Sequence, residues 1–469
     1  MEILNHLFVF LASVYLSLVP AREVREGVIQ QPDTFFPMQT DNTFEKTVSK
    51  LIFRGLFKYN IFGELENDLV DTYQISENGL EYTITIKKGQ YWIDGTEINS
   101  DDIIYSSINS PSLAGVAIDR VDDYTIRYTL QNKYAPFLSL LTQGIIKNNS
   151  IESSNSLIPI TSGDFRVLNV RRSGPIVKEI TLYSSKFKIP KLTFKFYETE
   201  DDLITAAKLG EIDTFLSEKD DINLESFNKE KISIISYSYG LFYNIDREKF
   251  VTKEMRQNMA KVINYKEVAE NFGIPVEGVI SKDQIFTNKK IVSNKYDSKF
   301  EQDNQEKKIY LKSTDTERNK KVIDLLERYF DDSLGYDLQV EYFNNNDFLE
   351  QVIKPKDYDI IFYGIETQRD PDRYVNWHSS GIAQGYNFTN FRNPTIDKTL
   401  EDGRSETDLT KRVSFYNKFQ EVFDQNLPAI YLFHPTTNYY FSKRITGIGE
   451  KYAFDVSDRF LDYFNWVTN

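Results

Sequence analysis

The chain has 469 residues, a length that favours two or three domains. Hydrophobic residues make up 40% and aromatic residues 14% of the chain, which indicates folded globular structure and argues against disorder. A net charge of −14 disfavours sequence-independent binding to nucleic acids, because such binding needs a basic surface. The absence of cysteine excludes disulfides, thiolate metal sites and cysteine nucleophiles, and three scattered histidines do not suggest a metal site, so we expect no cofactor and no metal.

The N-terminus carries an apolar run from Leu7 to Leu18, followed by Val19-Pro20-Ala21, a small-residue ending compatible with signal-peptide cleavage. The run is shorter than the roughly 20 residues that span a bilayer. Its upstream charge is Glu2, and arginine follows it, which is not the charge distribution of a standard export signal. We expect residues 1–21 to be a signal peptide or a membrane anchor; the alternative is a first core helix, or a chain start that lacks its true leader.

The first part of the chain is strand-rich and contains few helices. Apolar spacing predicts a helix over residues 47–56, and alternation predicts strands over 82–86 and 124–130. Asp94-Gly95 predicts a tight turn, and Ser100 is a good N-cap for the helix that follows.

The middle of the chain changes character. A helix is predicted over residues 201–209, a strand edge over 212–215 and a strand over 241–245. One long helix is predicted over residues 253–272. Residues 281–307 are polar and charged, so we expect a surface excursion there.

A regular alternation of strands and helices begins at residue 309. Strands are predicted over 309–311, 338–342 and 360–365, with a helix before each of the last two. This alternation implies a parallel sheet with right-handed crossovers. A strongly amphipathic helix follows over residues 413–423 and is stopped by Leu427-Pro428.

The last of these strands is the best candidate for carrying a site. The apolar run 360–365 fits a strand that is buried on both faces, and Glu366, Asp370, Trp377 and His378 follow its C-terminal end. Ligands of open α/β sheets bind just past the carboxyl ends of strands. The alternative is an ordinary buried strand followed by a solvated acidic loop.

Seven sequence blocks together carry a family resemblance. Each block alone is a weak signal, but seven blocks in one order are hard to produce by chance. In chain order they are LIFRGLFKYN with GELENDLVDTYQIS; LEYTITIKKGQYWIDGTEINSDDIIYS; ITSGDFRVLNV; AAKLGEIDTF; FYNIDREKFVTKEMRQNMAKVINYKEV; DYDIIFYGIETQRDPDRYVNW; and NFTNFRNPTIDKTLEDGRSETDLTKRVSFYNKFQEVFDQNLPAIYLF. This order resembles that of the family 5 extracellular solute-binding proteins, the peptide-binding and nickel-binding components of ABC importers.

The resemblance implies an α/β fold of the two-lobed, periplasmic-binding-protein-like type (type II). Lobe I would comprise residues 22–238 with a strand-rich insertion at about 53–158, and residues 442–469 would complete it. Lobe II would comprise residues 239–441. The two lobes would close on the ligand like a hinge.

The resemblance also implies where a ligand would bind. Peptide binders of this family add the ligand backbone to exposed strand edges, and Tyr363-Gly364-Ile365 matches the edge strand of lobe II. Counted back from Asp370-Pro371, the family's amine-binding aspartate falls at Thr367, but the segment is about one residue short, so Glu366 is the other candidate for that place. The predicted ligand-binding residues are Tyr363, Gly364, Ile365, Glu366, Thr367, Asp370, Trp377 and His378.

The leading functional hypothesis is a monomeric capture protein that binds peptides or similar small solutes and delivers them to the permease subunits of an ABC importer. It would act in the periplasm or on the outer face of the cytoplasmic membrane, held there by its N-terminal segment or by the permease. The second functional hypothesis is an enzyme. No Ser-His-Asp order, P-loop, GxGxxG or HExxH motif is present, so no catalytic residue is predicted. A ligand-sensing or chaperone-like peptide-binding protein without a transporter is the remaining alternative.

Overall fold

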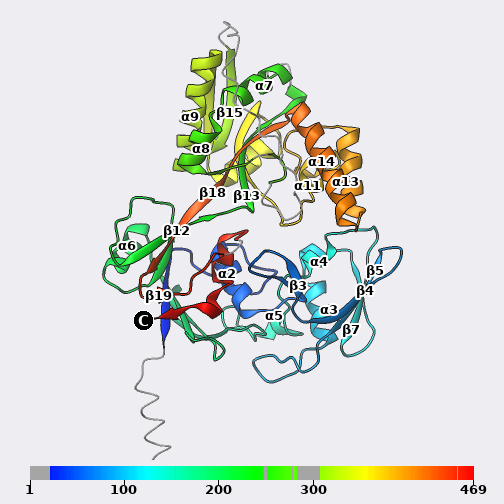
Figure 1. The fold of residues 1–469 in the computed structure, drawn as a ribbon, viewed down its shortest axis with the longest axis vertical. Helices are drawn as coiled ribbons and strands as arrows, with labels where there is room; N and C mark the ends of the chain where they lie inside the picture. Colours follow the sequence, from blue (N-terminus) through cyan, green and yellow to red (C-terminus); the bar gives the residue numbers. More distant parts are fainter. Residues whose placement is uncertain are drawn as a thin grey trace, which may run out of the picture.

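The protein consists of two α/β lobes, which lie one above the other in Figure 1. The computed structural model describes residues 22–153, 155–247, 251–276, 278–281, 307–450 and 453–468. The predicted leader and most of the predicted surface excursion at 281–307 lie outside these residues.

The sheet of lobe I is built around β1, which runs parallel to both of its neighbours, β10 and β11. Strands β9 and β8 extend the sheet in antiparallel fashion beyond β10. Helix α2 packs Phe44, Val48 and Ile52 into the core of this lobe. The elements are β1 (Glu23–Val28), α2 (Thr43–Ile52), β8 (Arg166–Ser173), β9 (Ile176–Tyr183), β10 (Lys191–Phe196), α6 (Glu200–Lys208), β11 (Thr214–Ser217) and β12 (Phe227–Ser233).

Between α2 and β8 the chain forms an insertion with its own small sheets, seen at the lower right of Figure 1. Its four-stranded antiparallel sheet has the order β4-β5-β7-β6, and a separate hairpin joins β2 to β3. The elements are β2 (Phe57–Tyr59), β3 (Leu65–Asn67), β4 (Val70–Ile75), β5 (Glu81–Ile86), α3 (Ser100–Ile108), β6 (Ala117–Arg120), β7 (Thr125–Thr129), α4 (Phe137–Leu140) and α5 (Ser150–Ser153).

Lobe II is a three-layer structure in which helices cover both faces of a sheet. Alternate residues of β13 and β17 enter two different cores: Leu241 and Phe362 pack with α7, α8 and α9, whereas Phe242 and Ile361 pack with α13 and α14. The expected burial of the strand on both faces is therefore confirmed. The helices are α7 (Lys253–Val262), α8 (Tyr265–Phe272), α9 (Glu317–Leu334), α11 (Tyr374–Trp377), α12 (Gly381–Gln384), α13 (Pro394–Ser405) and α14 (Leu409–Asn426).

The sheet of lobe II is mixed, although the sequence predicts a parallel one. Strands β16, β15 and β17 are parallel, as the strand–helix alternation predicts. Strand β13 enters from lobe I and pairs antiparallel with β17, so the sheet loses its parallel character on that side. The strands are β13 (Tyr237–Tyr243), β14 (Gly273–Pro275), β15 (Lys307–Thr314), β16 (Tyr336–Phe343), β17 (Ile360–Glu366) and β18 (Ala429–Ser442).

Strand β18 belongs to both lobes. Residues 429–435 pair with β13 and β14, whereas residues 436–442 pair with β12 and β11. A second connection crosses between the lobes from β12 to β13, and the terminal segment with η4 (Val456–Phe460) returns to pack on α2. The lobe boundaries drawn from the sequence remain a prediction; β18 itself changes partners near Pro435.

Three predicted helix boundaries are wrong for local reasons. Helix α2 begins at Thr43 because Asn42 and Glu45 form a capping box, and the chain is extended again at Phe53. The N-cap of α3 is Asn99, and Ser100 is the first helical residue. The predicted long helix over 253–272 is two helices, because the chain is extended at the end of α7 and Asn264 then caps α8.

The pKa of Asp424 on α14 predicts a pH-dependent stability. Burial raises the pKa of this carboxyl from 3.8 to about 7. Because the folded-state pKa is the higher one, the bound proton stabilises the fold fully below pH 3.8, and this contribution is lost as the pH rises to about 7. Asp424→Asn should therefore raise the free energy of unfolding at pH 8 by on the order of 2 kcal/mol and change it little at pH 4.

Urea unfolding at the two pH values measures this difference, and Asp119→Asn at an exposed position of β6 is the matched control. An equal effect of Asp424→Asn at pH 4 and pH 8 would contradict the assignment.

Candidate ligand-binding cleft

The C-terminal half of β17 has a strand partner on one side only. Strand β13 pairs with β17 as far as Glu366, whereas β15 pairs with it no further than Phe362. Among the described strands, none pairs with the other edge of residues 363–366. This free edge lies at the end of the sheet that points toward lobe I, where a peptide backbone could add to it.

Close packing against the neighbouring strand explains why residue 364 is a glycine. A Cβ placed there would lie 2.2 Å from Cε1 of Tyr237 and 3.0 Å from Cε1 of Tyr239. A glycine inside a strand can instead mark a place where a second backbone approaches closely. In the structure, the space is filled by the tyrosine rings of the neighbouring strand.

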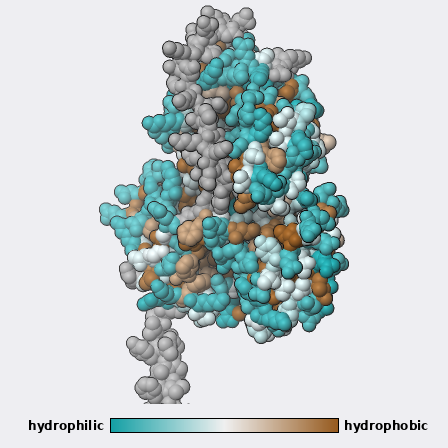
Figure 2. All heavy atoms as spheres, turned by 45° about the vertical axis from the view of Figure 1, so that its right-hand side comes forward, coloured by the Kyte–Doolittle hydropathy of each residue, from teal (hydrophilic) through white to brown (hydrophobic). Residues whose placement is uncertain are grey.

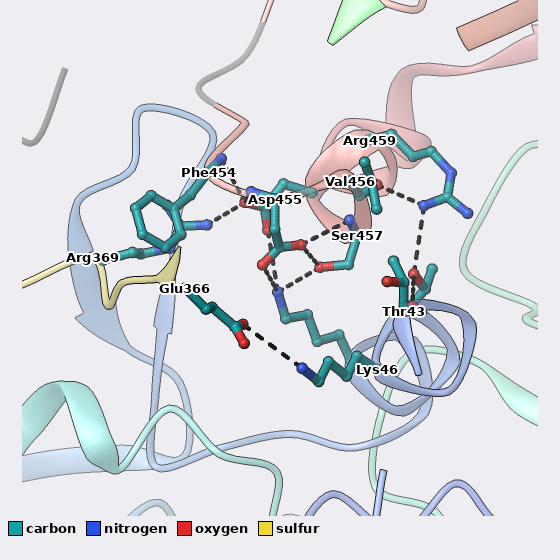
Figure 3. A network of polar contacts seen from close by, with 12 residues as sticks. Thr43, Lys46, Glu366, Arg369, Phe454, Asp455, Val456, Ser457 and Arg459 are labelled. Carbon is teal, nitrogen blue, oxygen red and sulfur yellow. Dashed lines mark hydrogen bonds and ion pairs between the residues drawn. The ribbon is translucent and has the colours of Figure 1, made fainter. Parts of the chain in front are cut away.

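Glu366 and Thr367 stand at the boundary between the lobes. The Glu366 side chain is 65% exposed, and its Oε1 lies 3.7 Å from Nζ of Lys46 on α2 of lobe I (Figure 3). The Thr367 N–H donates to the Ser236 carbonyl at 2.7 Å, at the crossing from β12 to β13. Glu366 is therefore accessible, and an exposed ion pair of this kind contributes little to stability.

Arg369, which the sequence analysis did not select, inserts from lobe II into a socket of lobe I. Its guanidinium is paired with Asp458 and lies 4.4 Å from the ring centroid of Tyr59 and 4.8 Å from that of Phe454. The side chains of Arg369 and Asp458 are 11% and 4% exposed. Removal from water strengthens both the ion pair and the cation–π contacts, so this socket is a strong polar link between the lobes.

The socket continues into a charge network on α2 (Figure 3). Lys50 Nζ lies 2.9 Å from a carboxylate oxygen of Asp455 and 3.5 Å from one of Asp458. Burial opposes ionisation of Asp455, but the Lys50 ammonium and Ser457 hold its pKa below the ordinary value. Partial desolvation likewise opposes the charge on Lys50, whose side chain is 51% exposed, but Asp458 and Asp455 hold its pKa above the ordinary value.

Asp370 and Asp372 are occupied within the protein. Asp370 receives two hydrogen bonds from the guanidinium of Arg412 on α14, at 2.7 and 2.6 Å, and is 7% exposed. Asp372 accepts from Arg404 at the end of α13 at 2.8 Å. These pairs fix the loop that follows β17, and a ligand amine at Asp370 would have to compete with Arg412.

Trp377 and His378 also lie inside lobe II. Trp377 is 2% exposed and packs edge-on against Phe423 at 4.6 Å. The His378 ring stacks on Tyr374 at 4.0 Å, with its Nδ1 2.7 Å from the Ser380 hydroxyl. Contact of either residue with a ligand would require its neighbours to move.

Of the predicted ligand-binding residues, Glu366 and Thr367 lie at the boundary of the lobes, and the backbone of Tyr363, Gly364 and Ile365 forms the free edge that leads to it, with the Ile365 side chain in the core of lobe II. Asp370, Trp377 and His378 are buried. Lys46, Arg369 and Asp458, which also lie at this boundary, were not predicted from the sequence. No local motif marks these residues, because each belongs to a different segment and only the folded chain brings them together.

The boundary between the lobes also contains an open cavity of about 420 Å³. Lobe II contributes Gln368 and Arg404 to its lining, and the insertion of lobe I contributes the rest. Figure 2 shows hydrophobic residues along the line where the two lobes meet, within a mainly hydrophilic surface.

Comparison with known families identifies this arrangement. The model of the bacterial extracellular solute-binding proteins, family 5 (middle), matches residues 64–386. The chain belongs to this family.

Individual relatives of this family-5 chain are distant but cover nearly all of it. It is 21% identical to the oligopeptide-binding protein AppA of Bacillus subtilis in an alignment of 476 positions that covers 90% of this chain and 88% of that protein. The ABC transporter substrate-binding protein CtaP of Listeria monocytogenes superposes with a TM-score of 0.80 at 19% identity, over 95% of this chain and 99% of that one. The structure of B. subtilis AppA with a nonapeptide superposes with a TM-score of 0.72 at 16% identity, over 96% and 100% of the two chains.

The Arg369 socket yields a prediction about the link between the lobes of this family-5 protein. Arg369→Gln should lower the free energy of unfolding by about 2 kcal/mol, less than the 3–5 kcal/mol typical of a broken buried pair, because Lys50 still faces Asp458. It should also raise the radius of gyration measured by small-angle X-ray scattering, since the lobes lose a buried ion pair that joins them.

Arg392→Gln is the matched control, because Arg392 forms an exposed ion pair with Asp246 inside lobe II at 2.9 Å. If both variants scatter like the unmodified protein, the socket does not hold the lobes together.

Proposed function

We propose that this protein captures peptides between its two lobes and presents them to the membrane subunits of an ABC importer. The family consists of solute-binding proteins, and the matched relatives include oligopeptide-binding proteins and a structure with a bound nonapeptide. The observation that carries the proposal is the free edge of residues 363–366 at the lobe boundary, because an unpaired strand edge binds peptide amides by β-augmentation.

The family assignment supports binding without chemical conversion of the ligand. Within the described residues, the carboxylates behind the free edge are neutralised by arginines, as in the pairs Asp370–Arg412 and Asp372–Arg404. A carboxylate held in this way is a poor general base, so the site favours retention of the ligand over turnover.

The family's extracellular setting supports a site of action outside the cytoplasm, with residues 1–21 as export signal or anchor. In the part of the chain that the structure describes, no helix combines the length and the hydropathy needed to cross a membrane. We propose that the protein works as a monomer and meets the membrane through its N-terminal segment or its permease.

Closure around a peptide is the first test of this function. A ligand that binds the closed state better than the open one must shift the population toward closure. Peptides recovered from the purified protein by mass spectrometry should therefore reduce its radius of gyration in small-angle scattering when added back at saturation. An unchanged radius with a saturating peptide would argue against capture between the lobes.

Glu366 is the proposed partner of the peptide's amino group, since it is accessible at the end of the free edge. Glu366→Gln should weaken binding of a recovered free-amine peptide by about tenfold, which corresponds to about 1.4 kcal/mol, because closure removes the ion pair from water. The N-acetylated form of the same peptide should lose most of this dependence in calorimetric titrations.

The matched control is Glu77→Gln in the exposed turn between β4 and β5. If both peptides bind the unmodified protein and both variants with equal affinity, the amino group is held elsewhere.

A further inference from the structure

The cavity at the lobe boundary has a lining unlike the rest of the protein. Among the residues that the structure describes, the charged ones that line it are Lys133 and Arg404, and no aspartate or glutamate does. The whole chain carries a net charge of −14, so a cavity bordered by cations alone runs against the overall composition. Such a local reversal of charge favours an anionic ligand group.

The floor and the rim of the cavity differ in polarity. Leu130 and Phe137 are buried and form an apolar floor with Leu140. Gln131, Asn132 and Gln368 supply amide groups at the exposed rim. A volume of about 420 Å³ lies within the range of small-ligand sites and accommodates a large side chain with its backbone.

Arg404 is held rigidly at the wall. Its Nε and Nη2 donate to Asp372, and its guanidinium lies 4.0 Å from the ring centroid of Tyr374 and 5.0 Å from that of Tyr134. Its backbone carbonyl accepts from the Ala135 N–H at 2.7 Å, which joins α13 to the insertion (Figure 1). Asp372 offsets much of the charge of Arg404. Lys133 therefore presents the less neutralised positive charge to the cavity.

Tyr134 adds a neutral donor. Burial raises the pKa of Tyr134 to about 12, so its hydroxyl keeps its proton at neutral pH. A protonated phenol that lines the same cavity as an ammonium and amide N–H groups completes a donor set for an oxyanion.

The cavity is within reach of a peptide on the free edge. Gln368 follows Glu366 by two residues that lie past the end of β17, and two residues span at most about 7 Å, so the cavity begins no more than about 7 Å beyond the edge. That distance is about the length of two peptide residues.

We propose that this cavity is a subsite for a carboxylate-bearing residue of the bound peptide, with the apolar part of that residue on the Leu130–Phe137 floor. The proposal rests on peptide capture as the function of the cleft. The carboxylate comes either from an acidic side chain close to the amino group that Glu366 holds or, in a peptide that runs along the edge in the opposite direction, from the C-terminus, and the two sources present the same chemistry to Lys133 and Tyr134.

Three tetrapeptide libraries with free amino groups separate the two sources. The first has free C-terminal carboxylates and no acidic side chain, the second has C-terminal amides and no acidic side chain, and the third has C-terminal amides and one glutamate. Affinity selection with mass spectrometry should enrich the first library, the third or both over the second by at least about tenfold. Equal retention of all three would overturn the subsite and leave peptide capture intact.

The double variant Lys133→Glu/Gln368→Glu tests whether the carboxylate of the peptide binds in this cavity. Both residues are exposed, so the fold should keep its melting temperature. The best acidic peptide should bind at least about tenfold more weakly to the double variant, and its amide analogue should change less than about threefold. Lys188→Glu, an exposed lysine outside the cavity, is the matched control and should change neither.

Equal losses for the acidic peptide and its amide, or no loss for either, would overturn the subsite while peptide capture stands. Retention of no peptide from any library would overturn peptide capture and the subsite with it.

Discussion

The shared strand β18 is the constraint on which the arrangement of the lobes depends. Its 14 residues bond first to β13 and β14 in lobe II and then to β12 and β11 in lobe I. The exchange of partners occurs around Pro435, whose carbonyl accepts from the Ile234 N–H on the second crossing segment at 2.8 Å. A change in a few dihedrals at these adjacent crossings would rotate one lobe against the other and leave both sheets intact.

Buried ion pairs hold the chain in place inside each lobe, on either side of these crossings. Glu26 on β1 and Arg459 on η4 form a pair with side chains 2% and 3% exposed, which ties the end of the chain to the centre of lobe I. Asp370 and Arg412 do the same within lobe II. Such pairs contribute little net stability compared with apolar packing, but the loss of one partner is costly, so they hold the chain in one arrangement. The residues around the Arg369 socket are therefore held in place by buried ion pairs in both lobes.

The chemistry of the cleft separates affinity from selectivity. The edge of β17 offers backbone amide and carbonyl groups, which read the repeating part of a peptide and accept many side chains. In the proposed mode of binding, charged groups would distinguish one end or one residue of the peptide from another: Glu366 faces lobe I with a negative charge, and Lys133 lies on the insertion with a positive one. Because both are exposed, their effect depends on how far closure removes them from water.

The sequence by itself determined the features that arise from local periodicity. The apolar run 360–365 specified a strand covered on both faces, and the alternation from residue 309 specified parallel pairing of β15, β16 and β17, because side-chain period and burial are properties of consecutive residues. The block order specified the family, and with it the place of the free edge. Tertiary structure decided the rest. Arg369 and Asp458 are 89 positions apart, Lys46 and Glu366 come from different lobes, and Asp370 is matched by an arginine on a later helix. Whether a carboxylate following a strand serves a ligand or an internal arginine depends on which side chains the fold brings against it, and no spacing along the chain carries that information.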